Sequence, residues 1–131
     1  MKRRIVRTDA APAAVGPYSQ AVVADGLVFT AGQLPLDPAG GGLITDDLAA
    51  ATRRTLENLD AVLRAAGSSL QLAVKLTVYM TDISRFGEMN EVYAEFFGGD
   101  PPARSAVEVS ALPKGAPLEI EAVALLEAPE A

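Results

Sequence analysis

The sequence contains no cysteine and no histidine. The absence of cysteine excludes disulfides, thiolate nucleophiles and thiolate metal sites. The absence of histidine excludes the usual zinc ligand sets and every catalytic triad or general base that depends on an imidazole. Any chemistry must therefore use carboxylates, arginine, lysine, tyrosine, hydroxyl groups, backbone groups and water.

The sequence also lacks a long apolar run and an excess of positive charge. No segment has the length of a membrane span or the apolar core of a signal peptide, so we expect a cytoplasmic protein. A net charge of −6, from 11 basic and 17 acidic residues, argues against a general affinity for nucleic acid or anionic membranes. The 131 residues, 50% of them hydrophobic, fit one domain over residues 1–131.

Hydrophobic periodicity predicts six strands and two helices. The strands are expected at 3–8, 19–25, 27–33, 72–81, 103–110 and 118–126, and the helices at 45–66 and 84–97. Asp25-Gly26 predicts a tight hairpin between the second and third strands. Thr45 can cap the first helix and Gly67 can end it. The apolar face of the fourth strand is expected to carry Leu72, Val74, Leu76, Val78 and Met80, and the buried stripe of the second helix Phe86, Met89, Tyr93, Phe96 and Phe97.

This order, β-β-β-α-β-α-β-β, predicts an α+β fold with a six-stranded mixed sheet and both helices on one face. The segment 72–110 is expected to form a parallel strand-helix-strand crossover. The last two strands carry apolar residues on both faces, while two helices can cover only one. We therefore expect a second subunit to cover the other face.

The stretch 102–121 holds the residues best suited to chemistry. Arg104 offers a planar, always charged fork that fits a small carboxylate. Glu119 and Glu121 alternate with apolar residues, and a carboxylate at the edge of a core can acquire a shifted pKa. On the residues alone, an ion pair between Arg104 and one of these glutamates is the favoured interpretation, because strand arginines mostly pair or face solvent.

Several ordered motifs along nearly the whole chain resemble those of the RidA/YjgF family of enamine/imine deaminases. They are Ala11-Pro12-Ala13-Ala14, Gly16-Pro17-Tyr18-Ser19-Gln20, Ala31-Gly32-Gln33, Asn58-Leu59, Ala65-Ala66-Gly67, Val74-Lys75, Asn90 with Tyr93, Pro102-Ala103-Arg104-Ser105, Val107-Glu108-Val109, Leu112-Pro113-Lys114 and Leu118-Glu119-Ile120-Glu121-Ala122. The resemblance implies a chorismate mutase-like fold and a homotrimer with clefts between subunits. It also implies that no metal or cofactor is used.

The activity that this resemblance implies is hydrolysis of reactive enamines and imines to 2-oxo acids and ammonia. The substrates would be 2-aminoacrylate with its tautomer 2-iminopropionate, and 2-iminobutyrate. By position, Arg104 would bind the substrate carboxylate and Glu119 would hold or activate the attacking water. The cleft would also be lined by Tyr18, Gly32, Asn90 and the backbone at Ala106. Many relatives have cysteine where this chain has Ala106. A position that works through its backbone tolerates alanine, whereas a thiol that helps the reaction would be missed and the rate would fall; the first interpretation is favoured, because cysteine is not a fixed requirement of the family's pattern.

Each of these residues also has a purely structural interpretation. Tyr18 could close the edge of the sheet, Gly32 could permit a close backbone approach, and Asn90 could brace a loop. Glu121 is assigned to structure or to an ion pair across an interface.

Two other function classes stay open. One is a regulatory trimer that binds 2-oxo acids through Arg104 without turnover, although pure binding would not need Glu119. The other is an RNA-directed endoribonuclease or translation inhibitor. The acidic balance, the missing histidines and the lack of a basic and aromatic stripe argue against it, so no nucleic-acid partner is expected.

Overall fold

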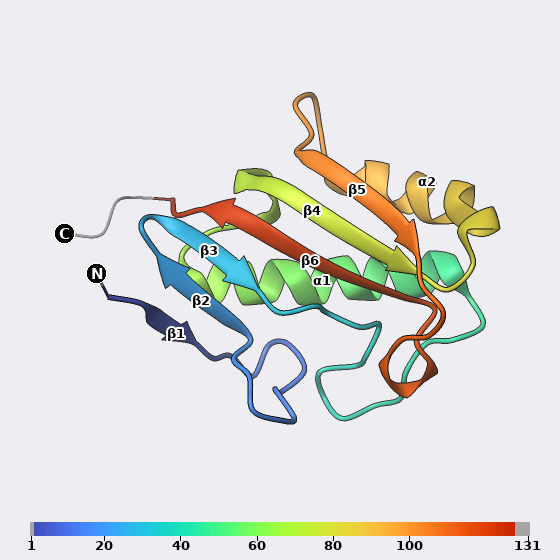
Figure 1. The fold of residues 1–131 in the computed structure, drawn as a ribbon, viewed down its shortest axis with the longest axis horizontal. Helices are drawn as coiled ribbons and strands as arrows, with labels where there is room; N and C mark the ends of the chain where they lie inside the picture. Colours follow the sequence, from blue (N-terminus) through green and yellow to red (C-terminus); the bar gives the residue numbers. More distant parts are fainter. Residues whose placement is uncertain (1, 128–131) are drawn as a thin grey trace.

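The computed structural model describes residues 2–127, which form one six-stranded mixed sheet with both helices on a single face (Figure 1). The strand order is β1-β2-β3-β6-β4-β5. The predicted fold class and the order β-β-β-α-β-α-β-β are confirmed. The elements are β1 (Arg4–Val6), β2 (Ala21–Ala24), β3 (Leu27–Thr30), α1 (Leu48–Ala66), β4 (Ala73–Met80), α2 (Phe86–Phe96), β5 (Ala103–Glu108) and β6 (Leu118–Leu125).

The hairpin between β2 and β3 is the one that the sequence predicts. Asp25 and Gly26 both have positive φ angles, 52° and 76°, as a two-residue turn of type I′ requires. This turn matches the right-handed twist of its strands and fixes the register in which Ala24 pairs with Leu27. Both strands are shorter than predicted, because the chain departs into loops beyond Gln20 and Ala31, where the Ala31 N–H still donates to the Gln20 carbonyl at 2.8 Å.

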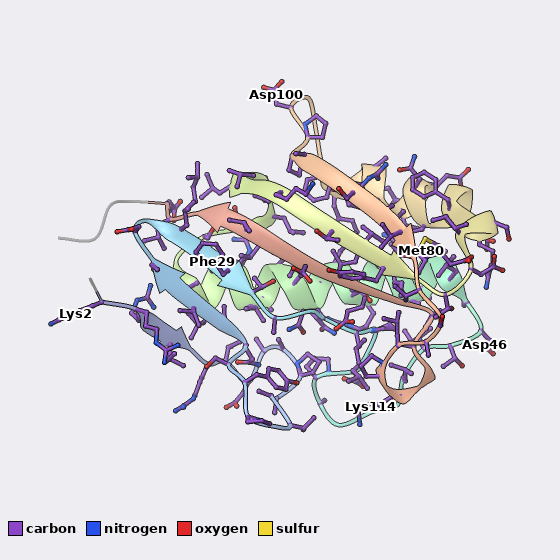
Figure 2. All side chains as sticks on the ribbon, viewed as in Figure 1. Lys2, Phe29, Asp46, Met80, Asp100 and Lys114 are labelled. Carbon is purple, nitrogen blue, oxygen red and sulfur yellow. The ribbon has the colours of Figure 1, made fainter. Side chains whose placement is uncertain are left out.

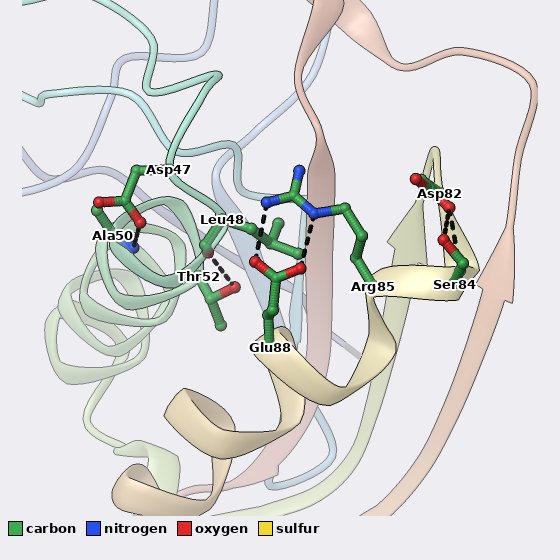
Figure 3. A network of polar contacts seen from close by, with 8 residues as sticks. All are labelled: Asp47, Leu48, Ala50, Thr52, Asp82, Ser84, Arg85 and Glu88. Carbon is green, nitrogen blue, oxygen red and sulfur yellow. Dashed lines mark hydrogen bonds and ion pairs between the residues drawn. The ribbon is translucent and has the colours of Figure 1, made fainter.

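The two helices begin later than the sequence suggests. The side chain of Asp47, not Thr45, caps α1 by accepting the Ala50 N–H at 3.0 Å. Gly67 ends α1 in the left-handed conformation, as predicted. Before α2, a short 3-10 turn (Ile83–Arg85) occupies the start of the predicted helix. Figure 3 shows the Asp47 cap of α1 and the Asp82 side chain, which caps the 3-10 turn by accepting the Ser84 N–H at 3.0 Å.

β6 lies between β3 and β4 and runs antiparallel to both. α2 connects β4 to β5, and these two strands pair in parallel, which confirms the predicted parallel crossover. The prediction for β4 was wrong at Val74. A bulge between Ala73 and Lys75 removes Val74 from the alternation, so this side chain is exposed instead of buried.

The two faces of the sheet differ sharply in burial. Side chains facing the helices are fully buried, among them Leu76, Val78, Leu118 and Ile120. On the opposite face, Phe29, Val107 and Leu125 remain 45%, 42% and 46% exposed. Figure 2 shows Phe29 on β3. Within residues 2–127, neither helix combines the length and hydrophobicity that crossing a membrane requires.

Candidate active site

Glu119 lies half-buried on the face of the sheet that no helix covers. Its neighbours on β6, Leu118 and Ile120, point into the core, so Glu119 points the other way. It lines a cavity of about 680 Å³, referred to below as the Glu119 cavity. Burial and, to a smaller extent, the charge of Glu121 raise the pKa of the Glu119 carboxyl above its ordinary value. A carboxylate in this environment is suited to accept and return a proton.

Gly32 brings backbone directly against the Glu119 side chain. The β3–β6 pairing slips by one residue around this position, and the Ala122 N–H there donates to the Thr30 hydroxyl at 3.0 Å. A Cβ atom at position 32 would lie 2.6 Å from Cδ and 2.8 Å from Cγ of Glu119. Only glycine fits beside Glu119 in this conformation.

Two buried amide side chains hold the loops that form the walls of the Glu119 cavity. Gln20 donates to the carbonyls of Thr8 and Pro12 at 3.1 and 2.8 Å, and accepts the Thr8 N–H at 2.7 Å. Asn58 on α1 donates to two carbonyls of the loop 34–36 at 3.0 and 2.8 Å. Each amide replaces the backbone partners that these loops lack.

Tyr18 and Lys114 complete the opening of the Glu119 cavity. The Tyr18 ring lines it and is 52% exposed, and the hydroxyl accepts the Val15 N–H at 3.4 Å. Lys114 lies in the loop between β5 and β6 (Figure 2). Its φ of 59° is uncommon outside glycine. Lys114 and the preceding Pro113 both line the Glu119 cavity.

Arg104 lies on the other face of the sheet, toward α2. β5 pairs with β4 so that Arg104 is opposite the fully buried Leu76, which places both side chains on the helix side. The guanidinium donates from Nη1 to Asn90 Oδ1 at 2.7 Å. Arg104, Asn90 and Tyr93 line a second cavity of about 360 Å³, the Arg104 cavity. Nε and Nη2 have no protein partner among the described residues, so one edge of the fork is available to a carboxylate.

The structure therefore separates Arg104 from Glu119 within one chain. They lie on opposite faces of the sheet and line two cavities that share no residue. No ion pair joins Arg104 to Glu119 or Glu121 in the part of the chain that the structure describes, so that interpretation of the sequence was wrong. Glu121 instead accepts the Tyr79 hydroxyl at 2.9 Å on the uncovered face.

Of the predicted cleft residues, Tyr18 and Gly32 lie with Glu119, and Asn90 lies with Arg104. Ala106 is half-buried on β5, opposite Val78, and lines neither of these two cavities.

Comparison with known proteins places the chain in a family. The model of the family described as endoribonuclease L-PSP matches residues 8–126. The chain belongs to the RidA/YjgF family. It is 50% identical to a RutC family protein of Pyrococcus horikoshii, over 95% of this chain and 99% of that protein.

Two further relatives bear on the site of this RidA/YjgF-family chain. A 2-iminobutanoate/2-iminopropanoate deaminase of Rattus norvegicus is 45% identical over 94% of this chain and 90% of the relative. The crystal structure of E. coli TdcF with bound serine has a TM-score of 0.88 and 42% identity, covering 93% of this chain and 98% of that one.

Sequence reasoning missed the part played by four residues of this family member. Gln20 and Asn58 belong to the motifs quoted above, but no local pattern indicates that their amides bind distant loops. Phe86 and Tyr93 were predicted to lie in the core, and they do pack there. Their faces also contact the guanidinium of Arg104, with ring centroids 5.1 and 4.6 Å from its central carbon. The helical spacing of Phe86, Asn90 and Tyr93 was the available signal.

Proposed function

We propose that this chain is a hydrolytic deaminase of 2-imino acids and their enamine tautomers, yielding 2-oxo acids and ammonia without a metal or cofactor. The substrates are 2-aminoacrylate with 2-iminopropionate, and 2-iminobutyrate. Similarity to the mammalian deaminase over most of the chain supports this reaction class. The proposal rests on the presence of two groups in one chain. The Arg104 guanidinium has an open edge that can bind a carboxylate, and the half-buried Glu119 has a raised pKa that suits proton transfer.

The two cavities form one active site only when two copies of the chain meet. The uncovered face of the sheet carries both the Glu119 cavity and the exposed apolar side chains Phe29, Val107 and Leu125. Burial of that face is favourable. Because β5 is an edge strand, a neighbour that packs across this edge would bring its Glu119 cavity to the Arg104 cavity. The assembly that we propose is a homotrimer with three such sites.

In this site Arg104 binds the substrate carboxylate through its Nε and Nη2 atoms. This contact fixes the imine carbon, which is already electrophilic when the imine nitrogen is protonated. E. coli TdcF binds serine, which carries the same arrangement of a carboxylate and a nitrogen on the adjacent carbon. Asn90 holds the guanidinium by accepting from Nη1, and so orients the open edge.

Glu119 transfers the protons. As a carboxylate it accepts a proton from water while the oxygen attacks the imine carbon and forms a tetrahedral carbinolamine. It then returns this proton to the amine nitrogen and the C–N bond breaks. As ammonia leaves, the carboxylate of Glu119 accepts the hydroxyl proton, so that the 2-oxo acid forms, and this proton departs with ammonia as ammonium. A raised pKa brings Glu119 closer to the operating pH, which favours these transfers. Tyr18, the glycine at position 32 and the backbone at Ala106 would shape the cleft around the reacting atoms.

The direct test generates 2-aminoacrylate in the cuvette with a pyridoxal-phosphate enzyme that acts on serine, and follows 2-oxo acid release with the purified chain. We expect acceleration over the spontaneous rate, equal with and without EDTA. Arg53→Ala is a matched control, because Arg53 is an exposed arginine paired with Glu95 on the helix surface. Binding of pyruvate without any acceleration would overturn the proposal and favour a regulatory binder.

A further inference from the structure

One stripe of α2 forms the surface on which the Arg104 guanidinium rests. Phe86, Asn90 and Tyr93 follow each other at spacings of four and three residues, which places them on one side of the helix. The guanidinium carbon lies 5.1 Å from the Phe86 ring centroid and 4.6 Å from that of Tyr93. Both distances are within the range of a cation–π contact. Asn90, between the two rings, accepts the hydrogen bond from Nη1.

These three contacts restrict the guanidinium in different directions. The ring faces limit movement of the guanidinium toward α2, and the hydrogen bond to Asn90 limits its rotation. Arginine side chains have much rotamer freedom, which is lost when they bind a ligand bidentately. A guanidinium already held in the binding orientation loses less of this freedom, so it binds more tightly.

We propose that Phe86 and Tyr93 are positioning residues that hold Arg104 in the plane needed for carboxylate binding. The inference rests on the proposed role of Arg104 as the ligand of the substrate carboxylate. Phe86 and Tyr93, which the sequence assigns to the core, should therefore have a measurable effect on the affinity for the carboxylate. Neither ring needs to touch the substrate.

The role of the Tyr93 ring can be distinguished from that of its hydroxyl group. Tyr93 is only 5% exposed, and its hydroxyl oxygen is buried with no hydrogen-bond partner among the described residues. Burial raises the pKa of this phenol, which stays neutral. The ring of Phe97 packs against that of Tyr93 at 4.6 Å between centroids and holds it in place. The ring face therefore does the positioning, and the hydroxyl contributes nothing to it.

The test compares three variants of the full chain, with pyruvate and 2-oxobutyrate as carboxylate probes in calorimetry. Phe86→Leu and Tyr93→Leu remove a ring face, and we expect each to raise the dissociation constant by roughly 3- to 30-fold. Tyr93→Phe keeps the ring, and we expect unchanged affinity with a slightly higher melting temperature, because an unpaired buried hydroxyl is removed. In the hydrolysis assay the leucine variants should raise KM and leave kcat nearly unchanged.

Phe96→Leu is the matched control, because Phe96 lies on the same helix and packs in the core without contacting Arg104. Phe86 is only half-buried, so Phe86→Leu carries the test even if Tyr93→Leu fails to fold. Folded leucine variants with wild-type affinity would overturn the positioning role alone. A wild-type chain that binds the probes but hydrolyses no imine would overturn the proposed function and still test the positioning by affinity. A wild-type chain that binds neither probe would overturn both.

Discussion

The Arg104 cavity and the Glu119 cavity are built in contrasting ways. Arg104 lies on the covered face of the sheet, where side chains from a single helix contact its guanidinium on several sides. Glu119 lies on the uncovered face and lines a cavity whose walls are loops. Hydrogen bonds from the buried amide side chains of Gln20 and Asn58 hold these loops in place. The contacts at Arg104 fix the orientation of the guanidinium, whereas the walls around Glu119 set how far its carboxylate is buried.

This contrast fits the roles that we propose for the two groups. A bidentate contact with a carboxylate depends on orientation, which ring faces and a hydrogen bond supply. A proton shuttle depends on its pKa, which burial adjusts without fixing an exact angle. Damage to the Arg104 cavity should therefore appear in affinity, and damage to the Glu119 cavity in turnover.

The largest effect is expected for Glu119→Gln. Glutamine keeps the shape but cannot accept the proton from water, so turnover should fall by roughly two to four orders of magnitude. Binding of 2-oxo acids should be nearly unchanged, which calorimetry can measure. A folded variant with undiminished hydrolysis would remove Glu119 from the mechanism.

Arg104→Lys should produce the complementary result. A lysine ammonium is a point charge that cannot make the two-pronged contact, nor rest on the rings of Phe86 and Tyr93 in the same way. We expect the dissociation constant for pyruvate to rise by roughly 10- to 100-fold, and further in Arg104→Ala. Wild-type affinity in Arg104→Lys would show that the carboxylate binds elsewhere.

Gly32→Ala tests the enclosure of Glu119 without altering the carboxylate. The added Cβ would overlap the Glu119 side chain and force it to move, so turnover should fall by roughly 10- to 100-fold. Gly42→Ala is the control, since a Cβ at Gly42 would meet nothing within 4 Å. Equal activities of the two variants would contradict the close packing of Gly32 on Glu119.

A smaller effect concerns stability and pH. Because the folded-state pKa of Glu119 is raised, its contribution to stability is present below the ordinary glutamate pKa and is lost as pH rises through the folded value. Glu119→Gln should therefore melt at a higher temperature than wild type at neutral pH, and the difference should shrink toward acidic pH.

Glu88→Gln is a control for which we expect a change in melting temperature of the opposite sign. A hydrogen bond from Arg85 lowers the pKa of Glu88, so its contribution is present at neutral pH and is lost as pH falls. This variant should melt below wild type at neutral pH. A lowered melting temperature for Glu119→Gln at neutral pH would instead point to a structural ion pair across the interface.

The sequence predicts most of the fold because its signals are local. Asp25-Gly26 specifies a turn through two positive φ angles, and Gly67 ends a helix for the same kind of reason. The N-cap was misassigned because Thr45 and Asp47 both have capping side chains, and only the path of the preceding loop decides between them. The bulge at Val74 likewise depends on pairing with β6, a distant strand.

The sequence also identifies the candidate residues through motifs, but it does not place them. Whether Arg104 and Glu119 share a face depends on the registers of β5 and β6 against β4, and a slip of one residue would reverse either side chain. The contact of Gly32 with Glu119 depends on an irregular pairing between strands distant in sequence. Long-range register therefore limited the prediction of the site.

The central claim is that one active site takes Arg104 from one copy of the chain and Glu119 from another. It is tested most directly by mixing Arg104→Ala and Glu119→Gln chains, unfolding and refolding them together, and measuring imine hydrolysis. In a cyclic trimer assembled at random from equal amounts, each site has a one-in-four chance of receiving both intact residues, so we expect roughly a quarter of wild-type activity from two nearly inactive parents. Activity that stays at the level of the parents, in mixed trimers verified by mass, would contradict a shared site.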